Sequence, residues 1–237
     1  MRNKRAVIVQ ARMSSSRFPG KSLELIGDKP LLYYVVKRLE ITGLPVIVAT
    51  SSDTSDDVLA DYLQGQNIKV FRGSLLNVLN RYIATAETFG VEEIIRVTAD
   101  NPLVDIVYLK KALSLFEKFE YVDGIYQEGL IKGTGFELFS LKELKSIKSN
   151  NPYHLEHVTS ALRENSPQNP LYNKLPVPTY HQFIDKIVLT CDYVEDLELL
   201  KLIFAVYNYK PTISIPEIID LYKRKPDLFA ANAFLHQ

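Results

Sequence analysis

Residues 6–22, AVIVQARMSSSRFPGKS, place a short apolar run directly before a loop rich in cations and hydroxyls. The run Ala6–Val9 has the length and β-branched content of a buried strand. Ligands of open α/β sheets bind beyond the carboxyl ends of the strands, so the loop Gln10–Ser22 is expected at a ligand site. Hydroxyls and exposed amides donate to phosphate oxygens, and Arg and Lys neutralise them. The loop therefore suits an oligophosphate, although its composition alone fits an exposed basic surface loop equally well.

Two common phosphate motifs do not describe this loop. Gly20, Lys21 and Ser22 match the end of a P-loop, but Ser15 stands where its first glycine is required. Pro19 also removes an amide from the region where a P-loop needs donors. No G-x-G-x-x-G follows the strand, so a dinucleotide-binding loop is not predicted either.

The pattern on either side of this loop predicts an α/β fold. Short β-branched runs alternate with amphipathic stretches, as in βαβ units with a mostly parallel sheet. The expected strands are 6–9, 46–49, 68–71, 94–97 and 187–191. The expected helices are 31–39, 55–63, 75–89, 107–119, 195–207 and 216–223.

One segment interrupts this alternation. From Tyr121 to Tyr180 the pattern loosens, with clustered glycines and a Pro/Asn-rich stretch at 165–178. We expect a single domain over residues 1–237 with an irregular insertion at 121–180 that contributes to the substrate pocket or to a subunit contact.

Composition limits the class of protein. Lys+Arg and Asp+Glu both number 28, so there is no overall basic field to bind nucleic acid or an anionic membrane. No stretch is long and apolar enough for a signal-peptide core or a membrane span. The one cysteine, Cys191, excludes an intramolecular disulfide and is expected in the core. We expect a cytoplasmic protein.

Two aspartates follow expected strands. Asp100 comes after 94–97 and Asp192 directly after 187–191. At strand ends both would face the cleft that holds the Arg/Lys loop, where two carboxylates can bind Mg²⁺. Each also fits a local role, since Asp100-Asn101-Pro102 is a turn sequence and Asp192 lies near a helix start.

A second polar cluster is less specific. His154, Glu156 and His157 lie close together, but no further ligands are nearby and a zinc site is not favoured. Glu156 and His157 fit an acceptor pocket and a structural role equally well.

The chain also resembles a known family. Ala11, Arg12, Ser14, Arg17, Pro19, Gly20 and Lys21 resemble the A-R-x-S-x-R-x-P-G-K signature of the sugar cytidylyltransferases, the superfamily of the CMP-Kdo and CMP-sialate synthetases, and most closely its SpsF-like branch. Further matches follow in order along the chain: 48–51 with 56–57, 71–74 with 78–79 and 81–82, 96–102, 137–140, 156–159, and Asp192 with 195–197. The resemblance implies a Rossmann-like, GT-A-like nucleotide-diphospho-sugar transferase fold.

The resemblance further implies a Mg²⁺-dependent enzyme that forms a CMP-sugar and pyrophosphate from CTP and a sugar, expected to be acidic, for surface polysaccharides. The implied site residues are as follows: catalytic Arg12, Arg17, Lys21 and Asp100; nucleotide-binding Ala11, Arg12, Ser14, Arg17, Lys21, Thr50, Arg81 and Asp100; acceptor-binding Glu137, Glu156 and His157; metal-binding Asp100 and Asp192. Arg96 is a weaker candidate. Asn77 and Asn80 stand where the SpsF-like pattern usually has acids, which leaves the role of those acids open here. Lys21, beside a glycine in a loop, is expected to be accessible to solvent.

Two alternative hypotheses belong to other classes. A glycosyltransferase of similar fold commonly binds a nucleotide-sugar through Asp-x-Asp, and Asp100-Asn101-Pro102 has no second acid two positions on. A non-catalytic nucleotide-binding protein would keep the loop without turnover. We also expect a homodimer that contacts through residues 124–178, which contain Tyr126, Phe136, Phe139, Tyr153 and Tyr172.

Overall fold

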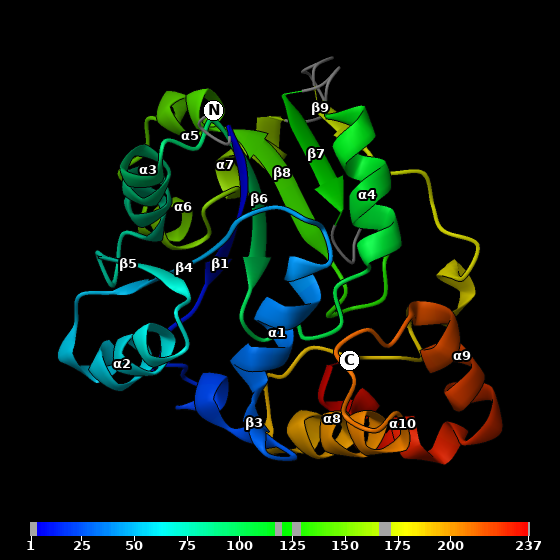
Figure 1. Cartoon of the computed structure of the whole chain (residues 1–237). Coiled ribbons are helices and arrows are strands. Elements are labelled where there is room, and N and C mark those ends of the chain that lie inside the picture. Colours follow the sequence, from blue (N-terminus) through cyan, green and yellow to red (C-terminus); the bar gives the residue numbers. More distant parts are fainter. Residues whose placement is uncertain (1–3, 117–119, 125–128, 166–171, 237) are drawn as a thin grey trace.

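A seven-stranded sheet forms the centre of the protein (Figure 1). The computed structural model describes residues 4–116, 120–124, 129–165 and 172–236. The sheet has the order β5-β4-β1-β6-β8-β7-β9, and only β8 runs antiparallel to its neighbours. The strands are β1 Arg5–Gln10, β4 Val46–Ser51, β5 Lys69–Gly73, β6 Glu93–Thr98, β7 Tyr121–Gly124, β8 Phe136–Ser140 and β9 Tyr172–Lys174, with a separate hairpin of β2 Leu25–Ile26 and β3 Lys29–Pro30. The predicted α/β fold with a mostly parallel sheet is confirmed.

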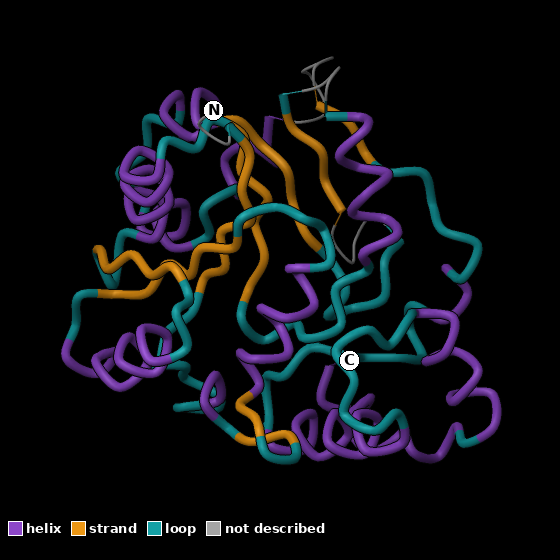
Figure 2. The backbone as a smooth tube through the Cα atoms, viewed as in Figure 1, coloured by secondary structure: helices purple, strands orange, loops and turns teal. Residues whose placement is uncertain are grey.

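Helices cover both faces of this sheet (Figures 1 and 2). They are α1 Leu31–Glu40, α2 Asp57–Gly65, α3 Val78–Phe89, α4 Ile106–Leu115, α5 Leu141–Ser146, α6 Pro152–Glu156, α7 Ser160–Asn165, α8 Val194–Val206, α9 Ile215–Arg224 and α10 Pro226–Ala233. Local signals set several ends: Asn77 caps α3, and Gly90 ends it in the left-handed conformation. The helix expected at 107–119 runs from Ile106 to Leu115, and residues 117–119 lie outside the described part of the chain.

Strand β1 shows how alternation divides the core. Val7 and Val9 point to the face covered by α1, α2 and α4, whereas Ala6 and Ile8 point to the face covered by α3, α5 and α7. All four side chains are at most 1% exposed. Strict burial on both faces is typical of a strand inside a parallel sheet.

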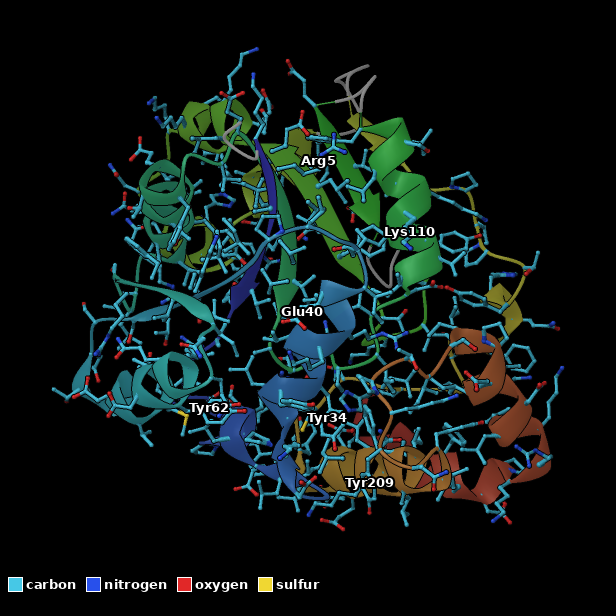
Figure 3. All side chains as sticks on the ribbon, viewed as in Figure 1. Arg5, Tyr34, Glu40, Tyr62, Lys110 and Tyr209 are labelled. Atoms are coloured by element: carbon cyan, nitrogen blue, oxygen red, sulfur yellow. The ribbon has the colours of Figure 1, made fainter. Side chains whose placement is uncertain are left out.

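The C-terminal helices form a third apolar cluster beside the sheet. Helices α8, α9 and α10 pack with one another, with Tyr34 of α1 and with residues 187–191. Figure 3 places Tyr34 and Tyr209 in this lower region, at the junction of α1 with the C-terminal helices. Cys191 is buried and unpaired there, as expected. No helix among the described residues is long and apolar enough to cross a membrane.

Two sequence-based expectations need correction. Residues 187–191 were expected as a strand but form only an isolated parallel bridge, Val188 with Lys132. Their apolar character comes from packing against the C-terminal helices, not from a place in the sheet. The segment 121–180 is irregular only in part, because 121–124 and 136–140 form β7 and β8 and extend the central sheet.

Burial also changes the set of aromatic residues available for a dimer contact. Phe136 and Phe139 are 2% and 0% exposed and belong to the core, so they cannot contribute to a subunit interface. Tyr153 is 53% exposed. Tyr126 and the side chain of Tyr172 lie outside the described residues.

Candidate active site

The loop after β1 folds back on itself and is tied to the sheet. Gly20 has a φ of +81°, a conformation that favours glycine, and its amide donates to the carbonyl of Met13 at 2.8 Å. The amide of Met13 in turn donates to Oδ1 of Asp56 at 2.6 Å. The short 3-10 helix Lys21–Leu23 follows at once. These contacts hold the loop at the carboxyl edge of the sheet.

Asp56 is the anchor of this loop, a role that its local sequence, typical of a helix cap, does not indicate. Its side chain is fully buried, and Oδ2 accepts from the amide of Ser51 and from the hydroxyl of Thr50, both at 3.0 Å. Thr50 itself is fully buried. Thr50 therefore supports the loop Gln10–Ser22 through Asp56 and is not itself a lining residue of the cavities described below.

Lys21 lies at the centre of the site. Its Nζ donates to Asp100 Oδ2 at 2.9 Å, to Asp192 Oδ1 at 3.0 Å and to the Cys191 carbonyl at 2.7 Å. The structure thus brings together three of the residues predicted for the site. Lys21 is only 8% exposed, so the expectation that it is solvent-accessible is wrong. Its ammonium donates to three acceptors that lie around it.

In this cluster the carboxylates offset the effect of burial on the pKa values of the two cations, Lys21 and Arg17. Burial alone would lower the pKa of Lys21, but the carboxylates of Asp100 and Asp192 outweigh it and raise that pKa. Arg17 Nη2 lies 2.8 Å from the same Oδ1 of Asp192, which raises the pKa of Arg17 despite its partial burial. Both side chains therefore stay cationic at neutral pH.

Two cavities meet at these carboxylates. The first, about 160 Å³, is lined by the loop residues Arg12, Ser15, Ser16 and Arg17, with Ala11 and Lys21. The second, about 250 Å³, lies toward β8 and is lined by Arg96, Asn101, Lys132 and Glu137, among others. Arg17, Thr98, Asp100 and Asp192 line both. One cavity is thus lined by the loop Gln10–Ser22, and the other lies beside it toward β8.

Glu137 lines the second cavity, but its carboxylate is already fully engaged. It is 1% exposed and accepts from Arg96, Arg163, Tyr121 and Thr159. Burial would raise the pKa of Glu137, but Arg96 and Arg163 outweigh that effect and lower it. Glu137 therefore acts as an ionised anchor that holds Arg96 at the cavity wall.

Other predicted residues lie outside the two cavities. Ser14 is exposed and is not among the lining residues, whereas Ser15 and Ser16 are. Arg81 is fully buried; its Nη1 donates to the Ser74 carbonyl, and its Nε and Nη2 have no partner among the described residues. His157 is exposed and stacks near Tyr153. Glu156 is exposed but reaches the loop, with Oε1 3.0 Å from Arg12 Nη2.

Asp100 and Asp192 are suited to hold a hard divalent cation. One ammonium contacts both, so their oxygens are close enough to share a cation. Both cations on Asp192 contact Oδ1, and Oδ2 accepts no hydrogen bond from the described residues. No group of three or more His, Cys, Asp or Glu side chains with metal-site geometry occurs in the described ranges. Mg²⁺ commonly uses one or two carboxylates and completes its shell with water and phosphate oxygens, so this pair fits Mg²⁺ better than zinc.

Lys132 and Asn101 were missed as site residues, because local sequence gives no signal for Asn101 and only a weak one for Lys132. Only the approach of residues 129–136 to residues 188–192 brings Lys132 to the cavity. A lysine beside the glycines 133 and 135 is a weak signal that could have identified it.

Comparison with known proteins agrees with this geometry. A sequence model of the family described as "Cytidylyltransferase" matches residues 6–217. The chain is 32% identical to the spore coat polysaccharide biosynthesis protein SpsF of Bacillus subtilis, over 93% of this chain and 94% of that protein. It is 28% identical to an 8-amino-3,8-dideoxy-manno-octulosonate cytidylyltransferase of Shewanella sediminis, over 88% of this chain and 89% of that protein.

A solved structure extends the similarity to three dimensions. A cytidylyltransferase from Leptospira borgpetersenii serovar Hardjo-bovis superposes with a TM-score of 0.87 at 30% identity, covering 95% of this chain and 96% of that one. The family match, the similarity to SpsF and the shared fold show that this chain belongs to the SpsF branch of the cytidylyltransferase family and is a nucleotidyltransferase.

Proposed function

We propose that this cytidylyltransferase transfers the CMP group of CTP to a sugar acid, with Mg²⁺, and releases pyrophosphate. The observation that carries the proposal is the position of Asp100 and Asp192 on the shared wall of two cavities, one lined by Arg12 and Arg17 and the other open to an acceptor. The Shewanella sediminis relative is named for an octulosonate, which supports an acidic acceptor.

The reaction is an in-line displacement at the α-phosphorus. A hydroxyl oxygen of the sugar forms a bond to the α-phosphorus, the bond from that phosphorus to the bridging oxygen breaks, and the hydroxyl proton is released. Positioning and charge neutralisation supply most of the catalysis in such reactions. The protein therefore needs to align the two reactants and to stabilise the departing pyrophosphate.

The loop residues provide the neutralising charge. Arg12 and Arg17 are partly exposed, with side-chain exposures of 31% and 52%, so both can turn toward a triphosphate. Ser15 and Ser16 line the same cavity and can donate hydroxyl hydrogen bonds to phosphate oxygens. Lys21 forms ion pairs with both Asp100 and Asp192 and so holds the two carboxylates together at the wall of the same cavity.

Asp100 and Asp192 are the residues that would hold Mg²⁺, which supplies neutralisation and polarisation of phosphate oxygens when it is bound. Thr98 donates to Oδ1 of Asp100 at 2.6 Å and leaves Oδ2 on the side of Lys21. That hydrogen bond restricts rotation of the Asp100 carboxylate.

A panel assay tests the proposal. The protein is incubated with Mg²⁺, each of CTP, UTP, GTP and ATP, and a set of sugar acids and neutral sugars, and pyrophosphate is followed by a coupled enzyme. Pyrophosphate from CTP with a sugar acid is the expected result. Pyrophosphate only with neutral sugars overturns the acidic acceptor. Sugar transfer from a supplied nucleotide-sugar, or CTP binding with no turnover on any acceptor, overturns the reaction itself.

A further inference from the structure

Lys132 is the unneutralised cation of the second cavity. Three cationic side chains line this cavity: Arg17, Arg96 and Lys132. Arg17 is paired with Asp192 and Arg96 with Glu137, whereas no carboxylate of the described chain contacts Lys132. The acids of the cavity are also engaged, since Asp100 and Asp192 bind Lys21 and Glu137 binds two arginines. Among the described residues that line the cavity, Lys132 is therefore the cation that remains without a carboxylate partner and available to a ligand.

His236 holds the ammonium of Lys132 in place. Lys132 Nζ lies 2.9 Å from His236 Nδ1, and because an ammonium can only donate, Nδ1 is the acceptor. The proton of a neutral imidazole is then on Nε2, which donates to Asp196 Oδ1 at 2.9 Å. The side chain of His236 is only 3% exposed, so this orientation is enclosed by the protein.

The same chain of contacts reaches the backbone of Asp192. Oδ2 of Asp196 accepts from the amides of Asp192 and Tyr193, each at 2.8 Å. Asp196 is fully buried, and Oδ1 also accepts from Asn232 Nδ2 at 2.7 Å. His236 thereby ties the position of Lys132 to the segment that carries Asp192.

The backbone next to Lys132 is fixed as well. Gly133 has a φ of +92°, and a β-carbon there would lie 2.1 Å from the amide nitrogen of Thr190. This close approach lies next to the bridge between Lys132 and Val188, and the side chain of Lys132 lines the cavity. Lys132 is therefore held at two points: its backbone by the bridge to Val188, and its ammonium by His236.

We propose that Lys132 binds the carboxylate of the acidic sugar acceptor and that His236 is its positioning residue. This inference rests on the proposed function and names the contact that selects the acceptor class. Without Lys132, the three acids that line the cavity, Asp100, Asp192 and Glu137, would outnumber its two arginines, and no unpaired cation would offset the charge of an entering carboxylate. Asn101 lines the same cavity, and its Oδ1 is buried without a partner among the described residues, which provides an acceptor for a sugar hydroxyl.

The first experiment removes the charge of Lys132. Pyrophosphate release from CTP is measured with 3-deoxy-manno-octulosonate, N-acetylneuraminate and the C1 methyl ester of each. Lys132→Met is expected to raise KM for the acids at least about tenfold and to leave KM for CTP within about twofold, because only the acceptor contact is lost. The wild type is expected to prefer each acid to its ester, and Lys132→Met is expected to lose that preference. Lys132→Arg keeps the positive charge and should therefore keep the preference for the acid.

Lys142→Met is the matched control. Lys142 is an exposed lysine with 79% side-chain exposure that pairs with Glu120, and neither residue lines the cavity, so its replacement should change neither KM. Turnover of the acids by Lys132→Met with an unchanged acid-to-ester ratio overturns the role of Lys132 and leaves the proposed function standing. Absence of pyrophosphate from every acceptor with the wild type overturns both.

The second experiment separates positioning from folding at His236. His236→Phe removes the acceptor for Lys132, whereas His236→Asn keeps an amide oxygen near the position of Nδ1. We expect His236→Phe to raise KM for the acids with a smaller change in kcat, and His236→Asn to restore part of the loss. Equal KM in His236→Phe and wild type overturns the positioning role. A fall of kcat by the same factor for acids and esters, with an unchanged preference for the acid, also overturns the positioning role.

Discussion

The ammonium of Lys21 lies 3.0 Å from Oδ1 of Asp192, a residue 171 positions later in the chain. The same ammonium binds Asp100, so one lysine from the loop Gln10–Ser22 joins the two carboxylates that line both cavities. The loop, the end of β6 and the segment before α8 are thereby held in one arrangement before substrate binds. Preorganised charges of this kind are the main means of catalysis in phosphoryl-type transfers.

Lys21→Ala is expected to reduce turnover roughly a hundredfold, which corresponds to about 3 kcal/mol in the transition state. It should also lower the free energy of unfolding, because two carboxylates are left close together without their cation. Steady-state kinetics and urea unfolding measure the two effects. Unchanged turnover in a folded variant would remove Lys21 from the site.

Asp100→Asn and Asp192→Asn are each expected to abolish most Mg²⁺-dependent activity, since an amide keeps the size but not the charge of the ligand. Asp192→Asn should be the less stable variant without ligands, because Lys21 and Arg17 both lose their partner on Asp192. Thermal melts with and without Mg²⁺ plus CTP test the assignment. A wild-type ligand-induced shift in both variants would show that the two aspartates do not hold the metal.

Glu137→Gln is expected to destabilise the fold by about 3 kcal/mol at neutral pH, because Arg96 and Arg163 lose their buried counter-charge. In the folded protein the pKa of Glu137 lies below its ordinary value of 4.5, so its contribution to stability is complete above that pH and is lost as the pH falls toward the lower folded pKa. The difference in stability between wild type and variant should therefore shrink in acid. The exposed Glu92, replaced by Gln, is the control, and an equal pH dependence of both differences would contradict the assignment.

Gly133→Ala is expected to cost at least about 3 kcal/mol of unfolding free energy, since the new methyl group meets the backbone of residues 189 and 190. Gly43→Ala is the matched control: Gly43 also has a positive φ, +75°, but a β-carbon added there would have no neighbouring atom within 4 Å. Its cost should be only about 1 kcal/mol, from the left-handed conformation. Similar costs for the two variants in denaturant unfolding would show that the close approach at Gly133 does not constrain the fold.

A homodimer remains a prediction. Tyr153 of α6 is 53% exposed and packs against the ring of His157, which leaves an aromatic surface on the segment expected to contact a second subunit. Light scattering at micromolar concentration should give twice the 27.0 kDa chain mass, and Tyr153→Asp should lower it. The monomer mass for the wild type would exclude a stable dimer.

Much of the fold follows from local patterns that the sequence contains. The runs 6–9, 46–49 and 94–97 lie within strands of the central sheet, and the run expected at 68–71 corresponds to β5, Lys69–Gly73. Short runs rich in β-branched residues are typical of strands that are buried on both faces. The position of the loop after β1 also follows, since ligand sites lie at the carboxyl ends of parallel strands. Lys21, Asp100 and Asp192 were expected at one edge of the sheet, and they meet there.

Tertiary structure decided which side chains face the cavities. Residues 187–191 have the composition of a strand but pack on the C-terminal helices, because burial by helices and burial in a sheet select the same apolar residues. Thr50 supports Asp56, and Lys132 reaches the second cavity only because Gly133 allows two backbones to touch. The contact of Lys132 with His236 joins positions 104 residues apart. Local sequence determines elements, since propensity and periodicity act within a few residues; the partners of Asp56, Lys132 and His236 depend on how those elements pack.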